Sequence, residues 1–277
     1  MAKYVFDPVQ QRGSTERTRR LRAESMSTQP HIYIERAVLE TEAYKMYEGT
    51  CSVPELRAKT LLHFFQNKKL YIGKDELIVG EKGDGPQAAP TFPELCCHTL
   101  EDMHNMNDRK IVNFTVTEED LKIQEEMIIP FWEKRSTRSK IVPSMTQEWR
   151  DAYSAGIFTE FMEQRGPGHT VGSKKAYEKG YLDYQKDIEE ALAKIDYMND
   201  PEALAKRDQL NAMHIACEAV MVLGKRYADY ARELAEKEEN PQRKAELLQI
   251  AANCDVVPAH KPETFWQAIQ TYWFTHL

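Results

Sequence analysis

The segment Phe158–Thr170 combines aromatic side chains, a Gly-Pro-Gly turn and a histidine. Glycine lets the backbone approach a ligand closely, and the imidazole of His169 can exchange a proton near neutral pH. A neighbouring phenylalanine could form an apolar wall. The pattern is compatible with a pocket in which a histidine acts as general acid or base, and also with a surface turn whose histidine faces solvent. The residues alone leave both interpretations open.

Two further groups have the composition of ligand sites. Cys96-Cys97-His98 brings metal-binding side chains together. However, zinc sites usually have a Cys-x-x-Cys type spacing and a second ligand pair downstream, and neither is present. Gly80–Gly85 is rich in glycine but matches neither the dinucleotide fingerprint nor the Walker A motif. We therefore predict no metal site and no cofactor-binding site in this chain.

Charged residues suggest no reaction by themselves. Paired carboxylates can perform acid–base chemistry, but we expect most of the candidates to be surface groups: Glu160, Glu163, Asp255 and Glu263. An arginine cluster near the N-terminus could contact RNA or an acidic partner. Because the formal net charge of the chain is −7, we interpret this cluster as a solvated helix or arm: Arg12, Arg17, Arg19, Arg20 and Arg22.

Composition indicates a globular protein. The chain has 277 residues, of which 42% are hydrophobic and 29% are charged. Residues Met1–Arg22 lack the apolar core of a secretory signal, and no apolar run reaches the roughly 18 residues that span a bilayer. The five cysteines are odd in number and scattered, unlike a disulfide framework. We expect a cytoplasmic protein that binds neither membrane nor nucleic acid.

Helical spacing dominates the first half of the sequence. Apolar residues recur at helical intervals from Ile34 to Tyr47, and Pro54 suits the first turn of a second helix. Thr117-x-x-Asp120 resembles a capping box that opens a helix. We predict that this helix continues to about Ile129, where Pro130 ends or kinks it.

Helix-starting residues are equally frequent in the second half. Thr146 is predicted to cap a helix that Gly156 closes, and Ser173 a helix whose apolar stripe reaches Ile195. Two Asx-Pro pairs begin the next predicted helices: Asp200-Pro201, with a helix to about Lys237, and Asn240-Pro241, with a helix to about Asn253. The short stretch Tyr197–Asp200 is the candidate linker, and it is too short to divide the chain into independent domains.

Two short runs have β character. Tyr71-Ile72 and Leu77-Ile78-Val79 are interrupted by Gly73 and followed by Gly80. Glycine and proline crowd the stretch Glu81–Pro93, which we predict to be a loop. The predicted fold is therefore mainly α with a few short β-strands.

The last segment, Pro262–Leu277, predicts a helix that is apolar nearly all round. Such a helix belongs inside a larger protein. We expect the chain to be truncated, so that an exposed apolar face from Phe265 to Leu277 makes it fold poorly and bind hydrophobic dyes. The alternatives are a terminal helix docked on its own domain and a helix used in a dimer.

Several motifs resemble those of the glycyl radical enzymes, the family of pyruvate formate-lyase. The stretch Asp255–Gln270 (DVVPAHKPETFWQAIQ) is similar to a proline- and glutamine-containing segment of these enzymes, and Asp75–Glu81 (DELIVGE) to an earlier strand. FTEFMEQRGPGHTV, beginning at Phe158, resembles the trans-4-hydroxy-L-proline dehydratase branch. TFPELCCHT at Thr91–Thr99 and IPFWEKR at Ile129–Arg135 resemble the same branch. The resemblance extends from about Arg17 onward.

This resemblance implies the N-terminal portion of a ten-stranded α/β barrel, here a truncated pyruvate formate-lyase-type domain spanning residues 1–277. In such enzymes a radical S-adenosylmethionine activase installs a glycyl radical, which generates a thiyl radical on a cysteine. The site must exclude solvent and oxygen, so the chemistry is anaerobic. The branch implies that the whole protein, expected as a homodimer, removes water from trans-4-hydroxy-L-proline to give a pyrroline-5-carboxylate.

The resemblance also assigns residues. His169 would be the polar substrate contact and catalytic group, and Phe161 would pack on the substrate ring. The radical cysteine, its partner glutamate, the radical glycine and an aspartate of the pocket are expected beyond Leu277. None of the five cysteines present has the context of the thiyl loop, and the fragment alone is expected to be inactive. Gly166 departs from the branch, which more often has another small residue there.

Two alternative interpretations stay open at this stage. One is another glycyl radical lyase, a decarboxylase or a formate C-acetyltransferase. The other is a free-standing helical binding module, or a spare part that replaces a damaged segment of a radical enzyme.

Overall fold

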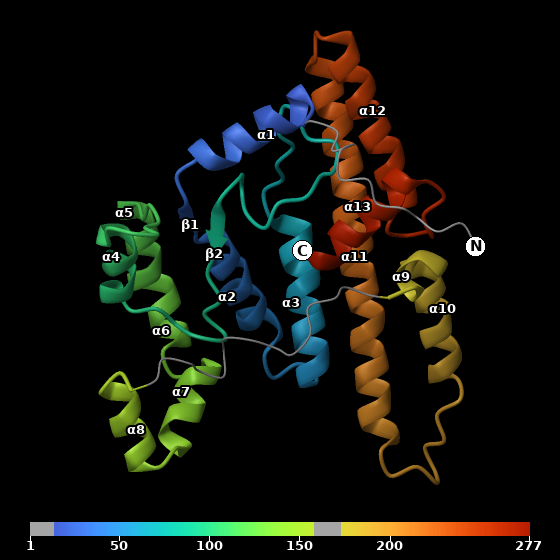
Figure 1. Cartoon of the computed structure of the whole chain (residues 1–277). Coiled ribbons are helices and arrows are strands. Elements are labelled where there is room, and N and C mark those ends of the chain that lie inside the picture. Colours follow the sequence, from blue (N-terminus) through green and yellow to red (C-terminus); the bar gives the residue numbers. More distant parts are fainter. Residues whose placement is uncertain (1–13, 158–172) are drawn as a thin grey trace, which may run out of the picture.

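The computed structural model describes residues 14–157 and 173–277 (Figure 1). The chain is mainly helical, and the elements in order are α1 (Glu16–Ser27), β1 (His31–Tyr33), α2 (Glu35–Tyr47), α3 (Val53–Asn67), β2 (Ala88–Pro90), α4 (Leu100–Asp108), α5 (Glu118–Ile123), a π-helical turn (Gln124–Ile128), α6 (Ile129–Trp132), α7 (Thr137–Ile141), a 3₁₀ turn (Val142–Ser144), α8 (Gln147–Ser154), α9 (Lys175–Glu178), α10 (Tyr181–Leu192), α11 (Ala203–Lys237), α12 (Pro241–Val256) and α13 (Phe265–His276).

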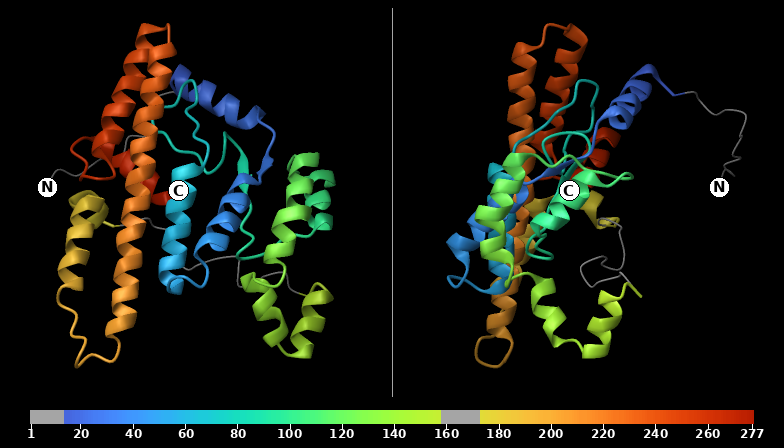
Figure 2. Two further views of the ribbon diagram at one scale, coloured as in Figure 1. Left: turned by 180° about the vertical axis from the view of Figure 1, so that it is seen from behind. Right: turned by 90° about the vertical axis from the view of Figure 1, so that its left-hand side faces the viewer.

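The long helix α11 is the central element on which several other helices pack. Its 35 residues give it a length of about 50 Å at the α-helical rise. Helix α12 packs along one half of α11 and α10 along the other, while α3 packs on a further side, as Figures 1 and 2 show. Alanines and other small residues on α11 allow this close packing, and Leu223 and Tyr227 are completely buried there. This helical layer holds the larger hydrophobic core.

A second core joins β1 and α2 to the lobe that contains α4, α5 and α6. Trp132 is its largest member, and its indole Nε1 donates a hydrogen bond to Thr41 Oγ1 at 2.8 Å. Tyr44 lies edge-on to the Trp132 ring, with centroids 4.7 Å apart. Satisfying the indole N–H inside the core allows this large ring to be buried without an unpaired donor.

The predicted positions of the strands are wrong. Tyr71-Ile72 and Leu77–Val79 are irregular, and the described sheet is instead a parallel pair of β1 and β2 with Ile32 opposite Ala89. Strand β2 therefore lies inside the stretch predicted to be a loop. The prediction of a mainly helical chain with a few short strands is nevertheless confirmed for the part of the chain that the structure describes.

Side chains of α13 explain why Leu77–Gly80 needs no neighbouring strand. Gln270 accepts a hydrogen bond from Val79 N at 2.9 Å and donates one to Val79 O at 2.7 Å. Trp266 Nε1 donates to Leu77 O at 2.8 Å, and Trp273 Nε1 donates to Gly80 O at 2.5 Å. These three residues occupy one face of α13 at positions i, i+4 and i+7. We call this arrangement the α13 clamp.

Local signals predicted most helix starts correctly. Thr117 and Asp120 form the capping box that opens α5, and Asn240 caps α12 through Gln242 N and Arg243 N. The helix beyond α5 does not end at Ile129, because a π-helical turn carries it past Pro130 into α6. Proline lacks an N–H and crowds the carbonyl four residues earlier, so widening the turn accommodates it.

Two further helix predictions need correction. The single helix predicted after Ser173 is divided into α9 and α10 by Gly180, where a Cβ would lie 2.2 Å from Ala259 O. The terminal helix begins at Phe265 rather than at Pro262, because Thr264 caps it through Gln267 N. In the described residues we find no helix with the length and apolarity needed to cross a bilayer.

Candidate functional site

The residues that sequence analysis assigned to a substrate pocket, Phe161 and His169, lie outside the described residues, as do Glu160 and Glu163. Of the remaining candidate carboxylates, Asp255 forms an ion pair with Arg232, and Glu263 is exposed. The described carboxylates of that set therefore provide surface contacts rather than a paired acid–base site.

Described residues on both sides of residues 158–172 make hydrogen bonds to other parts of the described structure. On the N-terminal side, Arg138 Nη2 donates to the hydroxyl of Tyr153 at 2.6 Å. On the C-terminal side, Tyr181 N and Leu182 N donate to the carbonyls of Pro258 and Ala259 at 3.0 and 3.1 Å. These carbonyls satisfy two of the donors that every helix N-terminus leaves unpaired. The backbone at Pro258 and Ala259 thus fixes the N-terminus of α10.

The group Cys96-Cys97-His98 lies in the loop before α4. Burial raises the pKa of the Cys97 thiol to about 11 and lowers the pKa of the His98 imidazole. Gln124 Nε2 donates to His98 O at 2.6 Å, so the backbone here is held by a core side chain. Within the described residues no group of three or more potential ligands surrounds a metal position.

A charged cluster that the sequence analysis missed lies between α2 and the loop after β2. Arg36 grips the carboxylate of Glu94 with both terminal nitrogens, at 2.7 and 3.1 Å. Its guanidinium also donates to Thr91 O at 3.1 Å and lies 3.9 Å from the centroid of the Phe92 ring. A two-pronged guanidinium–carboxylate pair is a strong and geometrically specific contact. Arg36 is therefore fully engaged.

Arg36 also forms an ion pair with a second carboxylate, that of Glu40, but over a longer distance than with Glu94. It is 8% exposed, and its Oε2 lies 3.4 Å from Arg36 Nη2. Burial, and next the charge of Glu94, raise the pKa of Glu40 to about 7, while Arg36 and Arg57 act in the opposite direction. Burial in a poorly solvated site favours the uncharged acid.

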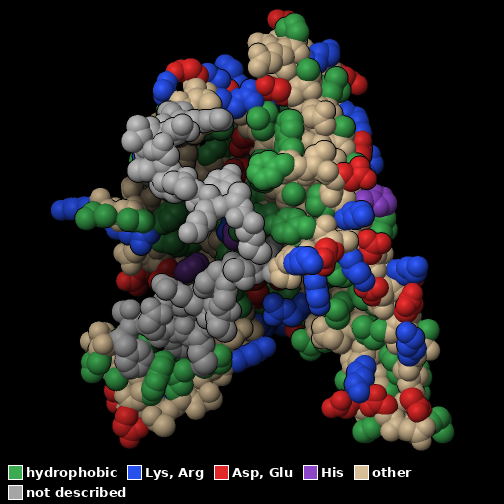
Figure 3. Space-filling view, turned by 45° about the vertical axis from the view of Figure 1, so that its right-hand side comes forward, with side chains coloured by type: hydrophobic (Ala, Val, Ile, Leu, Met, Phe, Trp, Pro, Cys, Tyr) green, Lys and Arg blue, Asp and Glu red, His purple; other side chains and the backbone are tan. Residues whose placement is uncertain are grey.

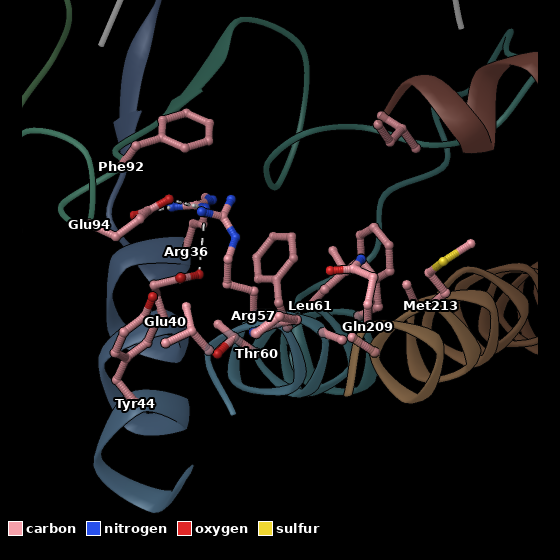
Figure 4. A pocket seen from close by; sticks show the side chains of 18 residues that line it. Arg36, Glu40, Tyr44, Arg57, Thr60, Leu61, Phe92, Glu94, Gln209 and Met213 are labelled. Atoms are coloured by element: carbon pink, nitrogen blue, oxygen red, sulfur yellow. Dashed lines mark hydrogen bonds and ion pairs between the residues drawn. The ribbon is translucent and has the colours of Figure 1, made fainter. Parts of the chain in front are cut away.

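This cluster borders a cavity of about 610 Å³, shown in Figure 4. Its walls come from α2, α3, the loop after β2, α11 and Leu277. Leu61, Phe64 and Met213 provide apolar surface, and Arg57 points into the same space as Arg36 (Figure 4). A cavity with apolar walls and a few convergent polar groups is the usual form of a small-molecule site.

One sequence signal could have revealed this cluster. Glu40 lies three residues after Ala37 and four before Tyr44, on the buried stripe of α2. A carboxylate on an apolar stripe requires a partner, and Arg36 at position i−4 is the nearest candidate. Glu94 could not have been found in this way, because it comes from a loop more than fifty residues away.

Figure 3 shows one outer face of the molecule. Acidic and basic side chains alternate along the arm formed by α10 and the lower part of α11, and hydrophobic side chains gather near the middle of the face. Among the described residues, α13 contributes Phe265, Ile269 and Tyr272 to the exposed large apolar side chains. This stripe agrees with the apolar character predicted for the last helix.

Comparison with known protein families shows to which family this chain belongs. The model of the family described as "Pyruvate formate lyase-like" matches residues 12–277. The chain belongs to this family. It is 58% identical over 266 residues to the trans-4-hydroxy-L-proline dehydratase of Clostridioides difficile, which covers 96% of this chain and 34% of that enzyme. The family predicted from the sequence motifs is confirmed.

A second relative in the family is less similar to this chain. Isethionate sulfite-lyase of Desulfovibrio desulfuricans is 32% identical over 259 residues, which is 90% of this chain and 31% of that enzyme. The crystal structure of hydroxyproline dehydratase from C. difficile with bound trans-4-hydroxy-L-proline superimposes with a TM-score of 0.90 over 95% of this chain and 33% of that one. The chain thus spans about a third of the length of these relatives, and its place in the fold of glycyl radical enzymes is confirmed.

Within this family member, the two motifs that carried the resemblance meet in space. Leu77, Val79 and Gly80 of the first motif are bound by Trp266, Gln270 and the nearby Trp273 of the last helix. Two of the acidic residues of the first motif are also bonded: Asp75 to Arg20, at 2.6 and 2.8 Å, and Glu76 to Gly73 N, at 2.7 Å. In the described residues these motifs therefore build the scaffold.

Proposed function

We propose that this chain is the N-terminal segment of a glycyl radical dehydratase that removes water from trans-4-hydroxy-L-proline and gives a pyrroline-5-carboxylate. The observation that carries the proposal is the 58% identity to the dehydratase of C. difficile, against 32% to isethionate sulfite-lyase. Members of one fold family diverge in the residues that contact substrate. The difference in identity therefore favours the substrate of the first enzyme.

Within this function, His169 contacts the substrate and assists proton transfer to the departing hydroxyl, and Phe161 packs on the pyrrolidine ring. Both assignments rest on the motif FTEFMEQRGPGHTV. A histidine suits this task because its proton affinity lies near neutral pH.

The remaining parts of the machinery belong, in this proposal, to a longer enzyme. These are the thiyl cysteine with its glutamate and the C-terminal domain with the radical glycine. A radical S-adenosylmethionine activase would be the partner that installs the glycyl radical. That radical would then abstract a hydrogen atom from the cysteine thiol. The whole enzyme would be an anaerobic, cytoplasmic homodimer, and this segment alone would be inactive.

A chimeric enzyme tests the proposal directly. Residues 12–277 replace the matching third of the C. difficile dehydratase, and the chimera is activated anaerobically by the activase of that enzyme. We expect it to consume trans-4-hydroxy-L-proline and to release pyrroline-5-carboxylate. Electron paramagnetic resonance measures the glycyl radical separately. A chimera that carries the radical but leaves hydroxyproline unchanged would contradict the substrate assignment.

The role of His169 is tested in the same chimera. His169→Gln should lower kcat by roughly a hundredfold or more while the radical signal persists, in line with the usual contribution of general acid–base groups. His104→Gln, at an exposed histidine of α4, is the matched control and should keep full activity. Phe161→Ala should mainly raise KM. Equal activity of the two histidine variants would remove His169 from the mechanism.

Reading the gene beyond codon 277 is the least expensive test of the proposed domain organisation. An open frame that continues into a cysteine loop and a glycine loop supports the longer enzyme. A stop codon followed by a well-behaved separate protein supports the spare-part interpretation instead.

A further inference from the structure

Helix α1 lies on the rest of the molecule without entering either hydrophobic core. None of its 12 residues is buried, and among the described residues neither core includes one of them. Figure 1 shows the helix extending from β1 toward α12. Burial of apolar surface is the main force that holds packed helices in place. Helix α1 must therefore be held mainly by contacts of another kind.

Two arginines of α1 form ion pairs with the elements beside it. Arg20 donates to both carboxylate oxygens of Asp75, in the segment 71–87, at 2.6 and 2.8 Å. Arg17 donates to Glu246 of α12 at 2.5 Å, and its Nε lies 4.0 Å from Asp75. The hydrogen bond from Arg20 lowers the pKa of the Asp75 carboxyl, so this pair is charged at neutral pH. The N-terminal half of α1 is thus attached by charge.

Hydrogen bonds attach the other half of α1 to the same segment. The hydroxyl of Tyr71 donates to the carboxylate of Glu24 at 3.1 Å, and Gln87 Nε2 donates to the backbone oxygen of Ser25 at 3.1 Å. The α13 clamp binds Leu77–Gly80 of this segment through contacts that do not involve α1. The segment therefore keeps a support of its own when α1 leaves it.

Contacts of this kind are weak and sensitive to salt. The side chain of Arg20 is 56% exposed in its pair with Asp75. Exposed ion pairs contribute little individually, and dissolved salt at 0.1 M screens charges over about 10 Å. A separate helix of 12 residues is also only marginally stable in water. Loss of the ion pairs should therefore both detach and unfold α1.

We propose that α1 is a detachable strap, which leaves the segment 71–87 and unfolds at raised ionic strength while both hydrophobic cores stay folded. Proteins commonly open in such local units, which are less stable than the whole. The side chains of Asp75 and Glu246 are 14% and 16% exposed while the strap is bound. Release of the strap uncovers both carboxylates, so this face becomes more acidic and more open to solvent. The strap uses no residue of 158–172 and does not depend on the dehydratase activity proposed above.

Hydrogen–deuterium exchange of the whole 277-residue chain, followed by mass spectrometry at neutral pH, tests the strap. We expect the backbone amides of α1 to exchange about fivefold faster in 0.5 M than in 0.05 M sodium chloride, because salt weakens the ion pairs. Amides of α11, which lies in the larger core, should exchange equally at both concentrations. Equal exchange of α1 at the two concentrations would overturn the proposal. A joint loss of protection in α1 and α11 would overturn it too, since the strap would then not open by itself.

Substitutions test whether the pair of Arg20 with Asp75 holds the strap. Arg20→Gln should speed the exchange of α1 about fivefold at low salt and reduce its salt dependence, since this pair is lost. Arg22→Gln is the matched control, because Arg22 is an exposed arginine of the same helix outside these contacts, and it should exchange as the parent does. Asp75→Asn should act like Arg20→Gln, and the double variant should exchange no faster than either single variant. Equal exchange in the two arginine variants, or additive effects of Arg20→Gln and Asp75→Asn, would overturn the proposal.

Discussion

The α13 clamp and the cavity between α2 and α3 both contain buried polar groups, but these groups differ in how completely they are paired. In the clamp, Val79 N and O are both bonded to the single amide of Gln270, which is 1% exposed. In the cavity, Glu40 is also buried, but its ion pair with Arg36 is longer, at 3.4 Å. Buried polar groups that are fully paired make a region rigid, and those that are partly paired leave capacity for a ligand. The difference separates a scaffold from a candidate site.

The largest effect is expected from breaking the clamp. Gln270→Leu leaves Val79 N and O buried without partners, and each unpaired group costs about 1–3 kcal/mol. We expect the free energy of unfolding to fall by about 3 kcal/mol in denaturant titrations. Gln66→Leu, at an exposed position on α3, is the control and should change it by less than about 0.5 kcal/mol. Similar values for the two variants would show that the clamp is not a stabilising contact.

The next effect concerns the cavity and depends on pH. The pKa of Glu40 is raised from 4.5 to about 7 in the folded chain, so folding favours its protonated form. Its contribution is therefore fully present below about pH 4.5 and is lost as the pH rises through 7.

Glu40→Gln should make the chain more stable than the parent at pH 8, by about 2–3 kcal/mol, since each unit of pKa shift corresponds to about 1.4 kcal/mol and the shift of Glu40 already includes its attraction to Arg36. The two proteins should converge near pH 4.5. Denaturation curves at pH 4.5, 6 and 8 measure this. A constant difference across the three pH values would contradict a buried, titrating Glu40.

A smaller effect is expected at the start of α13. Thr264 accepts a hydrogen bond from Gln267 N and so caps the helix that carries the clamp. Thr264→Ala should cost about 1 kcal/mol of unfolding free energy. Thr264→Asn should retain most of the stability, because asparagine is also a good cap. If both variants unfold like the parent, the position of α13 is set by the clamp alone.

The smallest effect on stability, with a clear effect on surface chemistry, is expected at the apolar stripe of α13. Phe265 is 82% exposed, so Phe265→Ser should change the unfolding free energy by less than about 0.5 kcal/mol. It should nevertheless lower the fluorescence of a bound hydrophobic dye such as anilinonaphthalene sulfonate. Exposed apolar patches bind such dyes. A folded parent chain that does not bind the dye would contradict the prediction of an exposed, dye-binding apolar face on α13.

The helices could be predicted because their signals are local. Thr117 with Asp120, and Asn240 with Pro241, each satisfy or replace helix N-terminal donors within a few residues. The family could be predicted for a similar reason, since its motifs are contiguous in the sequence. The assignment of Phe161 and His169 stays a prediction, because these residues lie outside the described structure.

Tertiary structure alone decided the conformation of Leu77–Gly80 and the existence of the cavity. The run Leu77–Val79 has the composition of a strand, but its hydrogen-bond partners are side chains about 190 positions later, which no local pattern specifies. Likewise, the sequence contains Arg36 and Glu40 at helical spacing, but Glu94 and the apolar walls come from other elements. The sequence by itself determined which segments are helical and to which family the chain belongs, because those signals act over a few residues. Pairing between distant segments is decided only when the chain packs, because packing alone brings their polar groups within bonding distance.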